Sequence, residues 1–529
     1  MTDTESTKKP NVLFVITDQH RADHVGFMGN DVVRTPNLDA LAERGTVFEN
    51  AWVANPVCMP NRSSIMTGRL PSAHGVIFND RSLEWGAATH VRQFREAGYR
   101  TALIGKSHLQ HGMSRNAVVP VDRTPTVDHG YHDRWDGLEH AERYEDGDLP
   151  EWPDDFYGFG HVELSIDHGA KVSGHHLHWA LDRGGRYEDL VVPYSPEAPA
   201  KRRSDRWWQV YEPPYDEELH STNFVTERTI SFINDAATAD DPWYAWVSFP
   251  DPHHPMTPPG RWYDRYSPDD IELPVSHDDP LTNAPEYLRR FQSFHPSDQR
   301  VWVGVCGGGD HRLVQEATAA NYGTIEFIDD GVGRILAAIE ALGQLDNTIV
   351  VFTADHGDMM GDHGLLLKGF MPFRGIQQIP MLIVDPRTPP AERQGRTASL
   401  ASSIDLSPTL MDLCDIPVHD GVQGRSLSPI LADASDRVRD HVLIEDDVRA
   451  AMAGLMRIPH RIRTVVSDDG MKFTRYSSGE TMLFDLAADP HEQDERSHVD
   501  PTATAVAHER LVDALLLAVD DARGAPVNH

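Results

Sequence analysis

The stretch Asn11-Val-Leu-Phe-Val-Ile-Thr-Asp18-Gln19 decides the fold class, because it is a short apolar run that ends in two polar residues. A continuous run of this length, rich in β-branched residues, is typical of a strand buried on both faces of a parallel sheet. Four more runs share this character: Thr101–Ile104, Trp243–Phe249, Thr348–Phe352 and Pro380–Val384. Helical spacing in Asn37–Glu43 and Tyr322–Leu342 completes the alternation. The sequence therefore predicts an α/β fold with a large, mostly parallel sheet flanked by helices.

Titratable side chains follow four of these runs at the point where each strand ends. They are Asp18-Gln19, Lys106-Ser107-His108, Asp251 to His254, and Asp355-His356. Ligands of open α/β sheets bind at the carboxyl ends of the strands. A single pair would be ordinary, because polar residues begin where strands stop. Four such groups at one edge predict a functional site.

Composition and charge exclude several classes of function. With 48 Lys and Arg against 82 Asp and Glu, the net charge of −34 argues against nucleic acid or an anionic membrane as a partner. The polar opening MTDTESTKKP has no apolar signal segment, and no early run approaches the roughly 20 residues that span a bilayer. We therefore expect a cytoplasmic protein without a membrane partner. Three cysteines, with no CxxC pair, indicate neither a disulfide framework nor a structural zinc site.

The character of the chain changes twice along its length. Residues 110–240 are rich in Trp, His, Asp and Pro with weak periodicity, which predicts long loop insertions in a catalytic α/β domain spanning 10–431. Residues 432–529 predict a smaller C-terminal α+β subdomain, with strands at Met471–Tyr476 and Met482–Leu486 before a helix near Ala505–Val519. The basic and aromatic stretch from Lys201 to Trp208 fits either the mouth of a pocket or a solvated or subunit-contact surface. A homo-oligomer is left open.

The most informative segment is Cys58-Met-Pro-Asn-Arg62-Ser-Ser-Ile-Met-Thr-Gly-Arg69. A cysteine at a helix N-terminus lies where backbone N–H groups favour an anion, and an arginine one turn later can return to the same place. The pattern Cys-x-Pro-x-Arg with Thr-Gly-Arg resembles the signature of the sulfatase family, within the alkaline phosphatase superfamily. In that family a formylglycine-generating enzyme oxidises the cysteine to formylglycine. The resemblance implies this fate for Cys58, and it implies that Arg62 holds the hydrated aldehyde or an oxyanion.

The resemblance extends to two strand ends that hold a divalent metal in the family. Asp18-Gln19 matches the first metal-binding strand, and Asp355-His356 matches the second, with His where other branches have Asn. Two carboxylates, an amide and an imidazole make a mostly hard site for Ca²⁺, Mg²⁺ or Mn²⁺, and the imidazole shifts the preference toward Mn²⁺. We expect one Ca²⁺ or Mn²⁺ ion, with Mg²⁺ a poorer match, bound by these four residues and the modified Cys58.

Further positions match family elements that contact the substrate. The sequence Gly-Lys106-Ser-His108 places two side chains on one face, and the resemblance makes Lys106 a sulfate ligand and His108 the base that expels sulfate. A Pro-His-x-Pro match selects His253, which together with Lys368 would contact the leaving-group oxygen. In a weaker match, Asn79 would touch the substrate.

These matches predict hydrolysis of a small anionic sulfate ester to sulfate and an alcohol or phenol. One alternative keeps the site and changes the substrate to a phosphonate monoester or phosphodiester, since both esters are tetrahedral. The Lys106–His108 element favours the sulfatase. A second alternative is an inactive sulfatase-like binding protein, which should have lost a ligand or a catalytic Lys or His. None of these residues is missing here.

Overall fold

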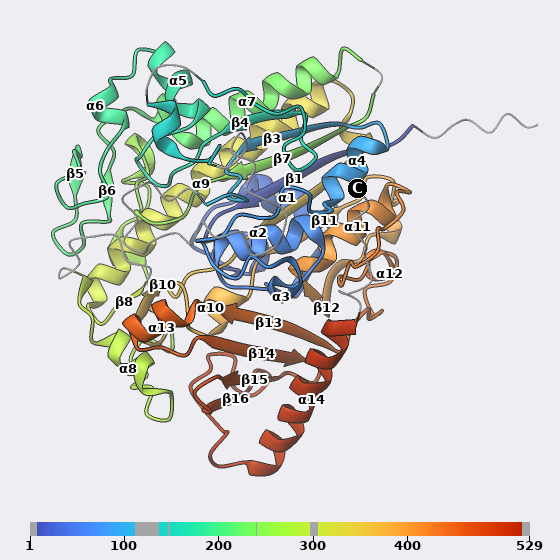
Figure 1. The fold of residues 1–529 in the computed structure, drawn as a ribbon. Coiled ribbons are helices and arrows are strands. Elements are labelled where there is room, and N and C mark those ends of the chain that lie inside the picture. The colour runs from blue at the N-terminus through green and yellow to red at the C-terminus, as the bar shows by residue number, and fades with distance from the viewer. Residues whose placement is uncertain (1–7, 112–136, 146–148, 240, 297–304, 521–529) are drawn as a thin grey trace, which may run out of the picture.

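The computed structural model describes residues 8–111, 137–145, 149–239, 241–296 and 305–520 (Figure 1). Its centre is an eight-stranded sheet in the order β12-β2-β11-β9-β1-β7-β3-β4. These strands are β1 (Asn11–Thr17), β2 (Thr46–Trp52), β3 (Arg100–Gly105), β4 (His161–Leu164), β7 (Trp243–Phe249), β9 (Thr348–Ala354), β11 (Met381–Val384) and β12 (Gly395–Ser402). All neighbouring pairs are parallel except those of β11, which is antiparallel to β2 and β9. The mostly parallel sheet is confirmed.

The central strands are apolar throughout because both faces of the sheet are covered. On β1, Val12, Phe14 and Ile16 pack into one hydrophobic cluster, and Leu13 and Val15 pack into the other. The first cluster contains side chains of α2 (Cys58–Thr67), α4 (His90–Glu96) and α11 (Leu406–Leu413). The second contains those of α1 (Pro36–Ala42), α7 (Ser221–Ala236) and α9 (His311–Ala341). The sheet is therefore the middle layer of three (Figure 1).

The five apolar runs all form strands, although Pro380–Val384, expected among the parallel strands, is the antiparallel β11. The prediction of loops over 110–240 is wrong in part, because α5 (His175–Asp182) and α7 lie there. The sequence of α7, STNFVTERTISFINDA, is rich in Thr, Ser and Asn, which are weak helix formers. Packing of its apolar face on the sheet decides the structure of this segment.

A smaller antiparallel sheet follows, made of β13 (His441–Asp447), β14 (Arg461–Ser467), β15 (Met471–Tyr476) and β16 (Thr481–Asp485). Helix α14 (Pro501–Asp520) covers one face, where Ala507 and Leu511 meet Val465 and Phe473. The other face packs against α8 (Glu286–Gln292). The expected α+β character of the C-terminal part is confirmed, and the division at residues 431 and 432 stays a proposal.

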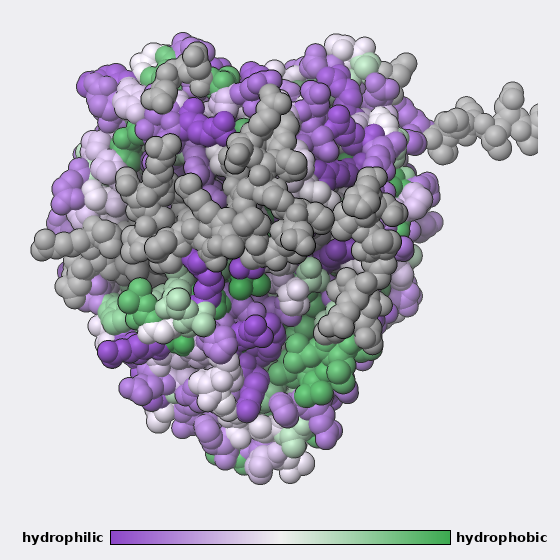
Figure 2. Space-filling model, viewed as in Figure 1, coloured by the Kyte–Doolittle hydropathy of each residue, from purple (hydrophilic) through white to green (hydrophobic). Residues whose placement is uncertain are grey.

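Part of the outer side of α14 is apolar. Leu516 and Leu517 are 62% and 61% exposed, and Figure 2 shows a hydrophobic patch over this helix. Such a patch is the kind of surface a homo-oligomer would bury, and that expectation remains a prediction. None of the described helices has the length and apolar character needed to cross a membrane.

A buried ion pair ties the small sheet to the chain at Pro372 and Arg374. Lys472 on β15 is fully buried, and its Nζ donates to Pro372 O at 2.6 Å and to Glu492 Oε1 at 2.6 Å. The other Glu492 oxygen accepts from the backbone N–H of Arg374 at 2.6 Å. Burial lowers the pKa of Lys472, while Glu492 raises it. The pair holds the chain just beyond Lys368 in place.

We predict that Lys472→Met lowers the free energy of unfolding by about 3–5 kcal/mol, because it leaves the Glu492 carboxylate buried without its cation. The double variant Lys472→Met/Glu492→Gln should recover part of the loss. Thermal unfolding followed by circular dichroism measures both. The matched control is Arg475→Met, which lies on the same strand with an exposed side chain and should change stability by at most about 0.5 kcal/mol. Equal losses in Lys472→Met and Arg475→Met would contradict the anchoring role.

Candidate active site

The four strand ends that carry titratable groups lie side by side. Strands β9, β1, β7 and β3 are consecutive neighbours in the sheet and all run parallel, so their carboxyl ends meet at one edge. Backbone bonds continue the register past the strands: Asp355 N donates to Thr17 O at 3.1 Å, and Lys106 N donates to Ser248 O at 2.9 Å. Helix α2 begins at Cys58. Cys58 therefore lies at the same edge, in contact with Asp18 and His356.

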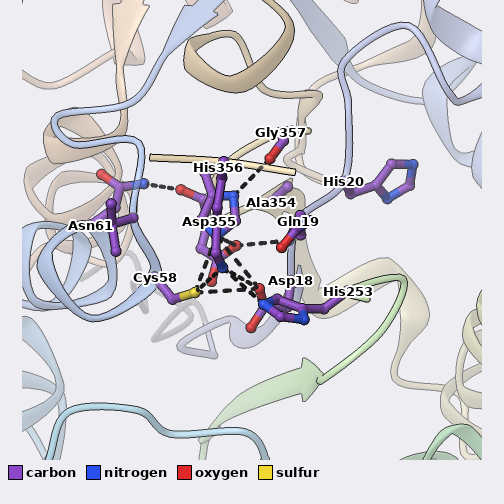
Figure 3. Close-up of polar contacts among 12 residues, drawn as sticks. Asp18, Gln19, His20, Cys58, Asn61, His253, Ala354, Asp355, His356 and Gly357 are labelled. Atoms are coloured by element: carbon purple, nitrogen blue, oxygen red, sulfur yellow. Dashed lines mark hydrogen bonds and ion pairs between the residues drawn. The ribbon is translucent and has the colours of Figure 1, made fainter. Parts of the chain in front are cut away.

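Cys58 lies at the centre of this edge and is fully buried (Figure 3). Its Sγ is 3.1 Å from His356 Nε2, 3.6 Å from Asp18 Oδ1 and 2.7 Å from Lys368 Nζ. Donor atoms of Asp18, Cys58, Asp355 and His356 all lie within 4.8 Å of one another. The predicted nucleophile and three predicted metal ligands are therefore brought together.

The orientation and charge of His356 suit a metal ligand. Its Nδ1–H donates to Gly357 O at 2.8 Å, so the lone pair of Nε2 faces the cluster. Burial lowers the pKa of His356 to about 4, and the positive charge of Lys368 acts in the same direction. A neutral imidazole and two buried carboxylates are the protonation states that cation binding requires. The residues present fit a divalent metal ion.

Gln19 contacts this cluster through its backbone. Its N–H donates to Asp355 Oδ1 at 3.0 Å. Its side-chain amide lies against the Asp358 carboxylate and 2.9 Å from His254 Nδ1. Direct metal ligation by Gln19 remains a prediction.

Arg62 is fully buried and holds the two carboxylates. Its Nε donates to Asp355 Oδ2 at 2.7 Å, and its Nη2 lies 3.5 Å from Asp18 Oδ2. Its Nη1 donates to Lys106 O at 3.0 Å and to Ser248 Oγ at 2.8 Å. The guanidinium thus fixes the geometry of the strand ends, and a direct role with the aldehyde or an oxyanion stays a prediction.

Lys368 and His253 form a pair beside the nucleophile. The Nζ of Lys368 lies 2.9 Å from His253 Nε2 and 2.9 Å from His356 Nε2. The acidic neighbours Asp18 and Asp355, with Cys58, raise the pKa of Lys368 against the lowering effect of burial. The structure brings both residues to the nucleophile position, and their contact with a leaving-group oxygen stays a prediction.

Lys106 belongs to the same cluster, and two other predicted residues lie at its margin. Lys106 Nζ contacts Asp18 Oδ2 and His168 Nε2. The ring of His108 lies edge-on to His168, with 6.4 Å between centroids. Asn79 Oδ1 accepts from the backbone N–H of Met59 at 3.1 Å, in the first turn of α2. Substrate contact by Asn79 remains a prediction.

His168 is a site residue that sequence reasoning missed. Its ring stacks on His253 with centroids 3.8 Å apart, and its Nε2 is 3.6 Å from Asp18 Oδ2. It follows β4, which pairs parallel with β3 and so ends at the same edge. The sequence of β4, HVEL, is too short and polar to predict a strand. A strand predicted at residues 161–164 would place His168 at the same edge as the other strand-end groups.

The two tryptophans at the end of the basic stretch have a structural role. Trp207 and Trp208 are buried in a cluster that includes Val210, Met256 and Cys306. The predictions that these indoles line a pocket mouth or lie on a solvated surface are wrong. The two residues lie between β5 (Arg202–Arg203) and β6 (Tyr211–Glu212), and their side chains are buried. Arg202 is exposed and pairs with Asp264 at 2.8 Å.

Glu139 is a second missed residue and holds the chain after β3. Its Oε2 accepts from His108 N at 2.6 Å, and its Oε1 accepts from Leu109 N at 3.0 Å and Gln110 N at 2.9 Å. The carboxylate is buried, and burial raises its pKa while these backbone bonds lower it. Glu139 therefore sets where His108 stands. It lies in a segment without periodicity, where the sequence has no signal for it.

Comparisons with known proteins agree on one family. The family model described as Sulfatase matches residues 10–416, and that of the N-sulphoglucosamine sulphohydrolase C-terminal region matches residues 361–516. An arylsulfatase of Clostridium perfringens is 31% identical over 92% of this chain and 89% of its own. The uncharacterized sulfatase YidJ of Escherichia coli is 30% identical over 98% of this chain and 88% of its own.

Among solved structures, a phosphonate monoester hydrolase of Agrobacterium radiobacter superposes with a TM-score of 0.75 at 25% identity. The alignment covers 96% of this chain and 95% of that one. The similarity spans both the large and the small sheet.

Glu139→Gln tests how the chain after β3 is held. The amide cannot accept all three backbone bonds, so hydrogen exchange at the amides of residues 108–110 should accelerate roughly tenfold or more. Peptide-level exchange with mass spectrometry measures this. The control, Glu142→Gln in the neighbouring turn Ala141–Tyr144, should leave these amides unchanged. Unchanged exchange in Glu139→Gln would refute the positioning role.

Proposed function

The chain belongs to the sulfatase family of the alkaline phosphatase superfamily and is a sulfuric ester hydrolase, and we propose that Cys58, converted to formylglycine, is its nucleophile. One observation carries the proposal: Cys58 Sγ stands within 3.6 Å of Asp18, His356 and Lys368 in a fully buried cluster. The sulfur marks where the oxygens of the modified residue would lie. A formylglycine-generating enzyme is the partner that this modification requires.

Asp18, Asp355 and His356, with residue 58, are the residues that would hold a divalent cation, and we propose Ca²⁺ or Mn²⁺. Bound there, the cation would withdraw charge from an ester oxygen and from the hydroxyl of the hydrated aldehyde. The hydrated aldehyde offers one hydroxyl for attack on sulfur and a second for the release of sulfate.

The residues of the chain supply the remaining charge and proton handling. Lys106 stands beside Asp18, where its Nζ can neutralise charge on the sulfate oxygens. Lys368 is the proposed proton source for the departing oxygen, because its Nζ stands beside residue 58 and 2.9 Å from His253 Nε2. Burial, with His168 and Lys368, lowers the pKa of His253 well below normal. His253 is then neutral and orients the ammonium through the 2.9 Å contact.

His108 is the proposed base for sulfate release. Burial and the charge of Lys106 lower its pKa well below the ordinary value, so the imidazole is neutral and can accept a proton. Its Nδ1 is buried and has no hydrogen-bond partner among the described residues. Glu139 fixes its backbone.

The local charge explains how so acidic a chain can take an anionic substrate. Arg62, Lys106 and Lys368 stand among two carboxylates, Asp18 and Asp355. These five side chains sum to one positive charge, and a divalent cation would add two more. The net charge of −34 over the whole chain does not describe this edge.

Hydrolysis of phosphonate monoesters is the second candidate function, favoured by the structural similarity to the phosphonate monoester hydrolase of Agrobacterium radiobacter. The same charges can stabilise a tetrahedral phosphoryl centre. The family membership favours sulfate.

We predict a higher kcat/KM for an aryl sulfate than for a phenyl phosphonate monoester, measured on protein made with a formylglycine-generating enzyme. Cys58→Ala should lower both rates by roughly 10⁴-fold or more, because it removes the nucleophile. Cys414→Ala, a change at a buried cysteine far from the site in sequence, is the control and should keep activity.

Peptide mass spectrometry completes this test. The peptide containing residue 58 should have the mass expected when one oxygen replaces sulfur and two hydrogens. Activity with an unmodified thiol would refute the formylglycine proposal, and a dominant phosphonate rate would make the second function the correct one.

The role of Lys368 predicts a dependence on the leaving group. Lys368→Ala should reduce kcat/KM about 10²- to 10⁴-fold for esters of poorly acidic phenols, and far less for 4-nitrophenyl sulfate, which needs no protonation. A Brønsted series of aryl sulfates measures the change in slope. Arg62→Lys, which disturbs the carboxylates, should lower all rates alike. A uniform loss in Lys368→Ala would argue against protonation of the departing oxygen.

A further inference from the structure

A second group of metal-ligand side chains lies outside the active site, at the start of α9. His277 and Asp278 lie in the turn between residues 274 and 279, ahead of α8, and His311 is the first residue of α9. One donor atom from each of the three residues lies within 4.8 Å of the other two. None of them belongs to the cluster around Cys58.

His277 has the orientation of a metal-binding histidine. It is 5% exposed, and its Nδ1–H donates to Gly361 O at 3.0 Å, which leaves the lone pair on Nε2. This Nε2 is buried and has no hydrogen-bond partner among the described residues. Buried polar atoms are ordinarily hydrogen-bonded. Because the Nδ1 of His277 has a partner and its buried Nε2 has none among the described residues, we expect Nε2 to bind a ligand.

His311 and Asp278 lie beside the His277 ring on its solvent side. His311 Nε2 is 3.4 Å from Asp278 Oδ1, and the His277 and His311 rings have centroids 4.8 Å apart. An edge of about 3.4 Å is what two ligands of a tetrahedral ion have when each bond is about 2.1 Å long. The side chains of His311 and Asp278 are 58% and 85% exposed, which leaves a path for an ion from solvent.

The turn that presents His277 is held rigidly. His277 N donates to Pro274 O at 2.9 Å, and Ser276 O accepts from His363 N at 3.1 Å. The Asp279 carboxylate bonds His363 Nδ1 at 2.8 Å. Only His311 and Asp278 would need to adjust their side chains to close on an ion.

A simple surface ion pair between His311 and Asp278 explains less. It accounts for their 3.4 Å contact, but it leaves His277 Nε2 buried without a partner among the residues that the structure describes. A cation accounts for both observations with the same atoms.

We propose that His277, Asp278 and His311 form a second metal site, which takes Zn²⁺ or a similar nitrogen-preferring transition ion, with water as the fourth ligand. Two imidazoles and one carboxylate favour Zn²⁺ over the oxygen-preferring Ca²⁺ and Mg²⁺. The ion would join the start of α9 to the turn 274–279 and, through Gly361, to the segment between His356 and Lys368. The site is separate from the proposed catalytic ion.

Zinc stoichiometry tests the proposal on the full-length protein. After chelation, the protein is dialysed against buffered Zn²⁺ and its bound zinc is measured by elemental mass spectrometry. His311→Asn and Asp278→Asn, both at exposed side chains, should each bind one zinc ion fewer per chain than wild type. Asp355→Asn removes a ligand of the proposed catalytic site and should keep the second ion. The double variant Asp355→Asn/His311→Asn should bind one zinc ion fewer than Asp355→Asn.

The matched control is His441→Asn. His441 forms a similar His–Asp pair with Asp440 at 2.7 Å but is in no group of three possible ligands among the described residues. It should bind as much zinc as wild type. Circular dichroism checks that each variant is folded. Equal zinc binding by wild type and His311→Asn, or an equal loss in His441→Asn, would falsify the second site, whatever the outcome at Cys58.

Discussion

The Arg62 guanidinium is the contact on which the rest of the active site depends. It comes from α2, yet it donates hydrogen bonds to Asp355 after β9, to the carbonyl of Lys106 after β3 and to Ser248 on β7. It also forms an ion pair with Asp18 after β1. Fully buried charges are tolerated only with close partners of opposite sign. The helix that carries Cys58 can therefore dock on the sheet in one position, where the guanidinium meets both carboxylates. Nucleophile placement and sheet geometry are consequences of the same ion cluster.

This cluster also explains the electrostatics of the site. Burial by itself would raise the pKa of Asp18, but the charges of Lys106 and Lys368 hold it well below its ordinary value. The carboxylate stays ionised in a dry environment because cations surround it. The same cations remain within reach of an anionic ester. Positive charge that stabilises the buried carboxylates is thus available for binding an anionic ester, although the chain as a whole is acidic.

The strands could be predicted where burial on both faces of the sheet requires a continuous apolar sequence. Strand β1 and its neighbours are apolar on both faces, so their runs were visible and their polar ends marked the site. Strand β4, with the sequence HVEL, and β12, with the sequence GRTASLAS, lie at the edges of the sheet, where mixed composition is allowed. Because the sequence of β4 does not predict a strand, it also does not predict that His168, which follows β4, lies at the site. Glu139 acts by accepting three backbone hydrogen bonds. It lies in an irregular segment, so no periodicity or motif spacing in the sequence predicts this role.

The position of Lys368 follows from contacts outside the cluster around Cys58. Arg21, just after β1, donates to Asp358 O at 2.9 Å, to Met359 O at 2.7 Å and to Asp362 Oδ2 at 2.7 Å. Asp358 Oδ1 in turn accepts from Leu367 N at 2.9 Å. The segment between His356 and Lys368 is therefore held at both ends and in its middle. Because a catalytic group loses rate when it must reorganise, this support lets the ammonium stand against Cys58 before substrate arrives. The strand ends supply the charges of the site, and the bonds behind them supply its preorganisation.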